Sequence, residues 1–261
     1  MAVTCCEVVG DGAEPVWPNL LLLSNSRQPG LGYLQHGLEA IRATLGGAQR
    51  LLFLPYAAVT VTHAEYLERV ATALKPLGCT VASSHAAPDP VAAVAQADAL
   101  VVGGGNTFLL LREVRRLGLL AAIRARVVAG APYIGWSAGA NLAGPTIRTT
   151  NDMPVCDPGG LDALGLVPFQ INPHYSNEVP PGWQGETRDQ RIAELLALDP
   201  AVTVVGLAEG TGLAVDASGI RLEGGPTCRV FRYGAPPRDL NAAADLGFLL
   251  MGDGAGKMLS K

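Results

Sequence analysis

The chain has 261 residues, 49% of them hydrophobic and 32 of them glycine, and it carries a formal net charge of −4. This size allows one sizeable buried core joined by tight loops, and an acidic balance without any Lys/Arg-rich run argues against nucleic acid or an anionic membrane as a partner. We therefore expect a small-molecule or peptide ligand.

The cysteines and the N-terminal residues narrow the class further. Five cysteines are an odd number without metal-ligand spacing, which argues against a disulfide framework or a zinc site and favours a reducing cytoplasm. Residues 1–18 lack the basic start and apolar segment of a signal peptide, and no apolar run is long enough for a transmembrane helix. We expect no membrane span, no metal and no cofactor, and we interpret residues 1–18 as a flexible extension.

Short apolar runs alternate with segments of helical period in the first half of the chain. The predicted strands are 20–23, 51–54, 80–82, 99–102 and 133–136. Between them, apolar residues recur every three or four positions over 34–45, and again over 67–74 behind a capping box of Thr62 and Glu65. Continuous apolar strands separated by amphipathic helices predict an α/β fold with a doubly wound, mostly parallel sheet.

After residue 145 the pattern changes to shorter strands around one helix over 188–198, with no linker to mark a second domain. We interpret this half as a mixed or antiparallel edge added to the same sheet. The predicted organisation is a single α/β domain over 19–240 and a C-terminal tail over 241–261. In such sheets, ligands bind outside the carboxyl ends of the strands. The strand ends expected to line one crevice are 24–26, 55–57, 103–106 and 137–141.

One strand end carries a candidate nucleophile, because Ser137 stands between Gly135 and Gly139 in the pattern G-x-S-x-G. A serine there can occupy a sharp strand-to-helix turn, where a Cβ at either glycine would clash. The helix that follows would direct N–H groups and its positive dipole end at the same point. Two glycines around a serine also make an ordinary turn, so the pattern needs partners to be specific.

An unactivated serine is a poor nucleophile, so a base has to be found among the four histidines. His174 follows a short apolar strand and its direction is restricted by Pro173. The other three, His36, His63 and His85, fall in predicted helices or in a polar connection. His174 is therefore the predicted base.

The third partner is a carboxylate that orients the imidazole and stabilises its protonated form. Asp152 is the first candidate, since it lies in a polar loop that follows the serine segment. Asp157 and Glu209 are competitors. The sequence does not decide which of the three carboxylates reaches His174.

A second glycine motif, VVGGGNTF, follows the predicted strand at 99–102. Consecutive glycines let backbone N–H groups approach a ligand closely, which suits one half of an oxyanion hole. Phosphate binding is the alternative, but the G-x-G-x-x-G and Walker A spacings are both missing. The motif therefore favours an oxyanion hole over a nucleotide site.

Five segments in this order and spacing carry a family resemblance: LLLLSNS, VVGGGNTFLLL, YIGWSAGANLAGPTIRTTNDMP, QINPHYSN and GETRDQRI. They closely resemble peptidase E, the aspartyl dipeptidase of the serine peptidase family that also includes the cyanophycinases. The similarity covers residues 19–235. It implies a fold like the class I glutamine amidotransferase domain and metal-independent hydrolysis of dipeptides with an N-terminal aspartate.

The resemblance also implies roles for particular residues. By motif position, Ser137 is the nucleophile, Asp152 the orienting acid and His174 the base. The implied oxyanion hole is made by the backbone N–H groups of Gly104, Gly105 and Ala138.

Selection of an aspartyl side chain requires a cation, and arginine suits a carboxylate because it can bind in a bidentate manner. Arg188 is the first candidate, since a predicted capping box of Thr187 and Gln190 puts it at the first helical position. A cation there opposes the helix dipole, and a residue placed against its local preference can serve a ligand. Arg148 is the second candidate cation, and Asn106 is a further predicted substrate-binding residue.

Two other classes of function stay open. One is a cyanophycinase-like peptidase or another serine hydrolase, such as an α/β-hydrolase esterase. In such esterases, however, the histidine commonly lies much further along the chain from the serine than His174 lies from Ser137. The other is a non-catalytic amidotransferase-like binding domain in which Ser137 is only a turn residue. The expected partner is a small peptide substrate, and a homodimer is expected because α/β domains with an added edge often pair.

Overall fold

A computed structural model describes residues 17–251 of the chain. Nearly all of the predicted N-terminal extension therefore lies outside the described residues, as does the end of the predicted tail. Residues 241–251 of that tail include the short 3₁₀ helix Gly247–Leu249, and Leu249 is buried in the main core. This part of the tail packs against the domain.

The larger of two sheets has seven strands in the order β3-β2-β4-β5-β1-β8-β9. Its strands are β1 (Leu20–Leu23), β2 (Arg50–Leu54), β3 (Thr80–Ser83), β4 (Ala99–Val102), β5 (Tyr133–Trp136), β8 (Gly212–Asp216) and β9 (Gly219–Glu223). The first five run parallel, whereas β8 pairs antiparallel with β1, and β9 pairs antiparallel with β8. The predicted strands, the mostly parallel sheet and its antiparallel edge are thereby confirmed.

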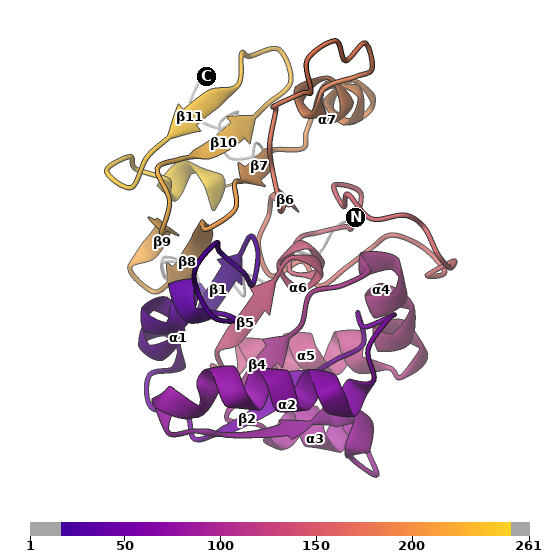
Figure 1. Cartoon of the computed structure of the whole chain (residues 1–261), viewed down its shortest axis with the longest axis vertical. Helices are drawn as coiled ribbons and strands as arrows, with labels where there is room; N and C mark the ends of the chain where they lie inside the picture. Colours follow the sequence, from indigo (N-terminus) through magenta and orange to yellow (C-terminus); the bar gives the residue numbers. More distant parts are fainter. Residues whose placement is uncertain (1–16, 252–261) are drawn as a thin grey trace, which may run out of the picture.

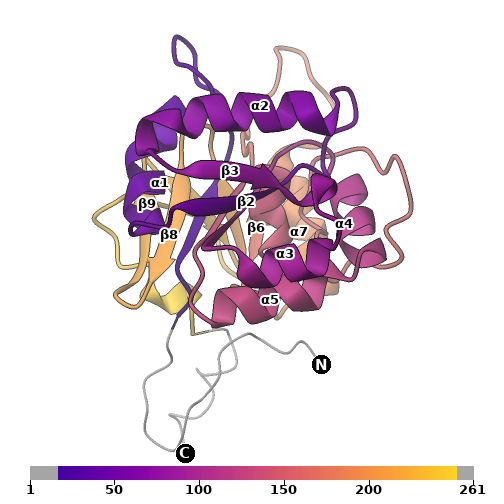
Figure 2. The same ribbon diagram turned by 90° about the horizontal axis from the view of Figure 1, so that it is seen from below.

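Helices cover both faces of this sheet, as Figure 2 shows with α2 above the strands and α3 and α5 below them. They are α1 (Leu38–Leu45), α2 (His63–Leu74), α3 (Pro90–Gln96), α4 (Thr107–Arg116), α5 (Leu119–Val128) and α6 (Ala138–Leu142). The buried strand residues divide between two cores, since Leu20 and Leu22 pack with α3–α6 while Leu21 and Leu23 pack with α1 and α2. Alternate side chains of one apolar strand thus serve opposite faces.

The remaining strands form a second sheet in the order β11-β10-β7-β6. They are β6 (Gln170–Asn172), β7 (Val204–Leu207), β10 (Cys228–Phe231) and β11 (Arg238–Leu240). The helix α7 (Arg188–Leu198) packs on it through Ile192 and Leu196, which contact Val204 and Phe231. The added edge of the large sheet is formed by β8 and β9, so the expectation that all of the short strands after residue 145 would join that edge is corrected here. The apolar pattern of a short strand does not determine which sheet it joins. Figure 1 shows this second sheet and α7 at the end of the molecule opposite α2.

Candidate active site

Ser137 occupies the sharp turn between β5 and α6, with φ 53° and ψ −113°. Added Cβ atoms would lie 2.4 Å from the Gly139 carbonyl oxygen at Gly135 and 2.2 Å from the Val102 carbonyl oxygen at Gly139. Only glycine fits at both positions, because such contacts are far inside van der Waals distance. The G-x-S-x-G pattern is therefore required by the close packing of α6 on the sheet, and it leaves the Ser137 hydroxyl at the end of the strand.

His174 follows β6 and presents its imidazole to the serine. Its Nε2 atom lies 2.9 Å from Ser137 Oγ, which is hydrogen-bond distance. The backbone is held in the left-handed region at φ 51°. The His174 N–H donates to Ser24 Oγ at 2.9 Å, and the Ser24 hydroxyl donates to the Leu207 carbonyl at 2.7 Å. Ser24, at the end of β1, thus ties the base to the large sheet.

Glu209 completes the hydrogen-bonded row, since its Oε1 atom lies 2.9 Å from His174 Nδ1. Its position follows from strand pairing, because β6 and β7 run parallel with Asn172 opposite Gly206. Residues that follow the two strands therefore emerge side by side. The neighbouring Gly210 N–H donates to Asn25 Oδ1 at 2.8 Å, which holds the Glu209 turn against the segment after β1.

Asp152 does not contact His174, and this corrects the predicted Ser137–Asp152–His174 arrangement. The Oδ2 atom of Asp152 instead accepts hydrogen bonds from the Thr107 N–H and hydroxyl, at 2.7 and 2.6 Å, and from the Thr150 hydroxyl at 3.1 Å. Asp152 is thus bound at the first turn of α4, where a carboxylate suits the free N–H groups and the dipole.

The competing carboxylate Asp157 is also engaged elsewhere, because it accepts a bond from the Gly159 N–H in its own turn at 2.8 Å. Glu209 was among the candidates that the sequence left open. The parallel register of β6 and β7 decides between them, and no local pattern around Glu209 could have done so.

The predicted oxyanion donors surround the serine. Within residues 17–251, no hydrogen bond uses the N–H groups of Gly104, Gly105 or Ala138. A Cβ at Gly104 would lie 3.0 Å from the Ser137 Cβ, and one at Gly105 would lie 2.2 Å from the Ala57 carbonyl oxygen. These three N–H groups are free to bind a negatively charged oxygen beside Ser137.

Tyr66 supports this loop from beneath. Its hydroxyl donates to the Gly104 carbonyl at 2.9 Å and accepts from the Trp136 indole N–H at 3.2 Å. Burial raises the pKa of Tyr66 well above its ordinary value, so the phenol stays protonated and remains a donor. The position of the Gly104 peptide is thus coupled to the strand that carries Ser137.

A cavity of about 450 Å³ opens over the serine. Among the residues that line it are Ser137, His174, Asp152, Gly104, Gly105, Asn106, Tyr33, Arg27 and Arg69. Two arginines that were not predicted from the sequence, Arg27 and Arg69, thus share the cavity with Ser137 and His174. Neither stands in a motif, and only the way α2 and the segment after β1 pack brings them to the site.

The predicted substrate-binding residues differ in their surroundings. Asn106 caps α4 by accepting from the Leu109 N–H at 3.1 Å, and its amide donates to the Met153 carbonyl at 2.8 Å. Arg148 forms an ion pair with Asp199 at 2.6 Å and does not line the cavity, so the structure gives no support to this second candidate cation.

Arg188 is the first residue of α7, behind the predicted capping box of Thr187 and Gln190, which is confirmed. It is half-buried, and no carboxylate of the described residues lies within ion-pair distance of its guanidinium. It donates to Asn151 Oδ1, and burial together with the nearby Arg191 lowers its pKa. Arg188 lies outside the cavity lining and approaches the site through Asn151, whose amide bonds the carbonyl just before His174.

Among residues 17–251, no group of three or more His, Cys, Asp or Glu side chains is arranged to hold a metal ion. No helix in that part of the chain has the length and apolar character needed to cross a bilayer.

Residues 20–223 match the sequence model of Peptidase family S51. The chain is 54% identical to peptidase E of Citrobacter koseri over 223 residues, and this alignment covers 85% of this chain and 97% of that protein. It is also 54% identical over 216 residues to peptidase E of Salmonella typhimurium, covering 82% of this chain and 94% of the relative.

Two solved structures share the fold. A candidate peptidase E from Listeria monocytogenes EGD-e superposes with a TM-score of 0.61 at 24% identity, covering 79% of this chain and 98% of that one. A peptidase from an acI-B1 Actinobacterium superposes with a TM-score of 0.68 at 16% identity, covering 89% and 98%. At these identities the likeness concerns the fold alone.

Proposed function

Because the chain belongs to Peptidase family S51 and is a serine-type dipeptidase enzyme, we propose that it hydrolyses dipeptides with an N-terminal aspartate by acyl transfer through Ser137. The observation that carries the proposal is the row of two hydrogen bonds from Ser137 through His174 to Glu209, each of 2.9 Å. A serine, an imidazole and a carboxylate in this sequence form the arrangement that activates a hydroxyl for attack on a carbonyl.

In the proposed reaction, Ser137 Oγ attacks the scissile carbonyl carbon while His174 Nε2 takes the hydroxyl proton. Glu209 holds the other ring nitrogen and stabilises the imidazolium that forms. The negative oxygen of the tetrahedral intermediate binds the N–H groups of Ala138 and the Gly104–Gly105 loop. His174 then gives its proton to the leaving amine, and a water molecule activated by the same base hydrolyses the acyl-enzyme.

Arg188 is the proposed clamp for the aspartyl carboxylate. It has no carboxylate partner among the described residues, and it is partly desolvated at the start of α7, where its own charge is unfavourable. An incoming carboxylate would relieve that cost and could also approach the helix N-terminus. Within the described part of the chain the Arg188 guanidinium donates to Asn151, and its remaining donors are available for the substrate.

Asp152 is proposed to bind the α-ammonium group of the substrate. It lines the cavity with Ser137, and while its Oδ2 atom takes three bonds from Thr107 and Thr150, no described residue donates to its Oδ1 atom. A carboxylate held rigidly on one oxygen and open on the other suits a primary ammonium. This assignment explains an acidic residue in the site that does not serve the base.

Several finer properties are proposals of the same kind. We propose that the enzyme acts without a metal in the cytoplasm, pairs as a homodimer, and has a fold related to the class I glutamine amidotransferases. A cyanophycinase-like activity remains the alternative on the same catalytic row, and turnover of a polymer with an aspartate backbone and arginine side chains would reveal it.

The decisive experiment is a panel of Asp-X, Glu-X and neutral dipeptides, assayed with the wild-type enzyme and with Ser137→Ala. The proposal expects turnover of Asp-X substrates, much weaker turnover of the others, and none with the variant. Rapid hydrolysis of neutral dipeptides would overturn the specificity, and activity of Ser137→Ala would overturn the mechanism. An additional assay with a strong chelator should leave the activity unchanged.

A further inference from the structure

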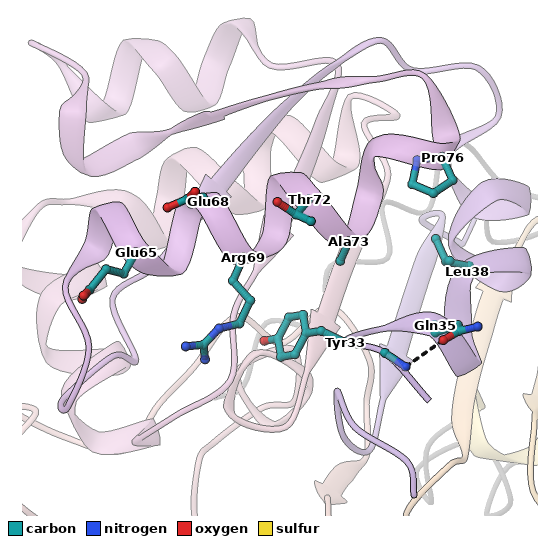
Figure 3. A pocket seen from close by; sticks show the side chains of 10 residues that line it. Tyr33, Gln35, Leu38, Glu65, Glu68, Arg69, Thr72, Ala73 and Pro76 are labelled. Atoms are coloured by element: carbon teal, nitrogen blue, oxygen red, sulfur yellow. Dashed lines mark hydrogen bonds between the residues drawn. The ribbon is translucent and has the colours of Figure 1, made fainter. Parts of the chain in front are cut away.

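Two arginines lie together in the cavity on the side formed by α2 and the segment after β1. Arg27 and Arg69 both approach the ring of Tyr33, with guanidinium carbons 5.4 and 5.9 Å from its centroid. Figure 3 shows the Arg69 side chain leaving α2 and lying beside the Tyr33 ring. Stacking on an aromatic ring restricts a guanidinium without using its hydrogen-bond donors, so these donors remain available.

Neither arginine is neutralised by a carboxylate. No Asp or Glu of residues 17–251 lies within ion-pair distance of Arg27 or Arg69. Of the two acidic residues near Arg69 on α2, Glu65 is engaged by the N–H and hydroxyl of Thr62, at 2.8 and 2.7 Å. Glu68 points away from Arg69 in Figure 3. Two positive charges therefore face the cavity without an ion pair among the described residues, although the Arg69 charge is near enough to contribute to the lowered pKa of Glu65.

The arginine pair is connected to the reacting centre by aromatic contacts. The Tyr33 ring meets the Trp136 ring edge-on at 6.2 Å between centroids, and Trp136 immediately precedes Ser137. The Tyr33 hydroxyl also donates to the Tyr66 hydroxyl at 3.2 Å, and Tyr66 supports the Gly104 peptide. The pair is thus connected to the proposed oxyanion hole through two aromatic residues, Tyr33 and then Tyr66.

This side of the cavity is opposite to the proposed aspartyl clamp. Arg188 begins α7 on the second sheet, whereas Arg69 lies on α2, and Figure 1 shows these helices at opposite ends of the molecule. If the N-terminal residue of the substrate is directed toward α7, the leaving residue is directed toward α2. A leaving residue that ends the chain carries its free carboxylate about 3.5 Å, one residue step, beyond the scissile nitrogen.

We propose that Arg27 and Arg69 bind the free α-carboxylate of the leaving amino acid and so select substrates that end one residue after the scissile bond. The inference rests on the proposed function, because it concerns the leaving side of the same reaction. Guanidinium groups match a carboxylate better than any other side chain. A longer peptide or a C-terminal amide presents no negative charge at this point and loses the contact.

The test compares Asp-Leu with its C-terminal amide on three enzymes. The wild type should favour the free acid over the amide in kcat/KM by roughly tenfold or more, the size of a charge-assisted contact. In the double variant Arg27→Ala/Arg69→Ala, this ratio should fall close to one, mainly through slower turnover of the acid. Arg188→Ala should slow both substrates alike and keep the ratio. Added salt should lower the wild-type ratio, since both arginines are exposed.

The matched control is Arg42→Ala, which removes an exposed arginine on α1 whose ion-pair partner among residues 17–251 is Glu39. It should leave both the ratio and the rates unchanged, and melting curves should show that the double variant is folded. A wild-type ratio near one, or a double variant that keeps the wild-type ratio, would overturn the carboxylate site while leaving the proposed dipeptidase intact. Failure of the wild type on both Asp-Leu and its amide would instead refute the proposed function and the site that depends on it.

Discussion

The two halves of the catalytic row are built differently. The proposed nucleophile stands in a local motif, where β5, Ser137 and α6 are consecutive in the chain and two glycines permit the close packing. The proposed base and acid instead follow β6 and β7, two strands of the second sheet that are distant in sequence and neighbours only through parallel pairing. A nucleophile can thus be identified from a few residues, whereas its partners depend on how sheets assemble.

The largest expected effect tests whether the two halves act as one unit. Ser137→Ala and His174→Ala should each lower kcat by about 10⁶, as measured for comparable serine triads, and the double variant should lose little more. The reason is that neither residue catalyses without the other. Single-turnover assays on an Asp-X dipeptide would measure the three rates, with circular dichroism as a control for folding. Multiplicative losses in the double variant would show that the residues act independently.

The next effect concerns the acid and distinguishes the two carboxylates. Glu209→Gln should lower kcat by about 10³ to 10⁴, because an amide cannot stabilise the imidazolium or hold the same tautomer. Asp152→Asn should act mainly on KM, because its carboxylate is proposed to bind the substrate ammonium.

Steady-state kinetics of both variants on the same dipeptide gives the comparison. A large loss of kcat in Asp152→Asn, together with unchanged kcat in Glu209→Gln, would show that Asp152 is the orienting acid, as the family resemblance implies.

A smaller effect concerns specificity on the second sheet. Arg188→Ala should lower kcat/KM for Asp-X dipeptides by roughly 10²-fold, the size expected for a charge-assisted bidentate contact in a partly desolvated site. Neutral dipeptides should be much less affected. Arg191→Ala is the matched control, because that arginine is exposed on the same helix and lies near Glu186. Equal losses on aspartyl and neutral substrates would assign Arg188 a structural role.

The smallest effect tests the connection between the halves. Ser24→Ala removes the hydroxyl that accepts from the His174 N–H and donates to the Leu207 carbonyl. We expect kcat to fall about tenfold because the base is displaced, and stability to fall by about 1 kcal/mol because the His174 N–H loses its acceptor, whereas the Leu207 carbonyl keeps the bond from the Tyr175 N–H. Ser218→Ala, in the exposed turn between β8 and β9, is the control. Unchanged kcat in Ser24→Ala would show that the second sheet positions His174 without this bridge.

The sequence determined the first half of the fold closely. The predicted strands at 20–23, 99–102 and 133–136 coincide with β1, β4 and β5, and both predicted capping boxes begin helices. Continuous apolar strands and amphipathic helices of the right spacing leave few alternatives, since each element has to bury one pattern against its neighbours. The elbow around Ser137 was predictable for the same reason, because steric clashes act between residues close in the chain.

Only the tertiary structure decided the rest. The division of the short strands into two sheets, the choice of Glu209 over Asp152 beside His174, and the meeting of Arg27 with Arg69 at Tyr33 all join segments far apart in the chain. Local propensity and periodicity describe a strand but not its neighbour, and pairing register is determined by the packing of whole layers. Five residues of the sequence are therefore enough to predict Ser137 as the nucleophile, while its hydrogen-bonded partners are decided by how distant strands pair and pack.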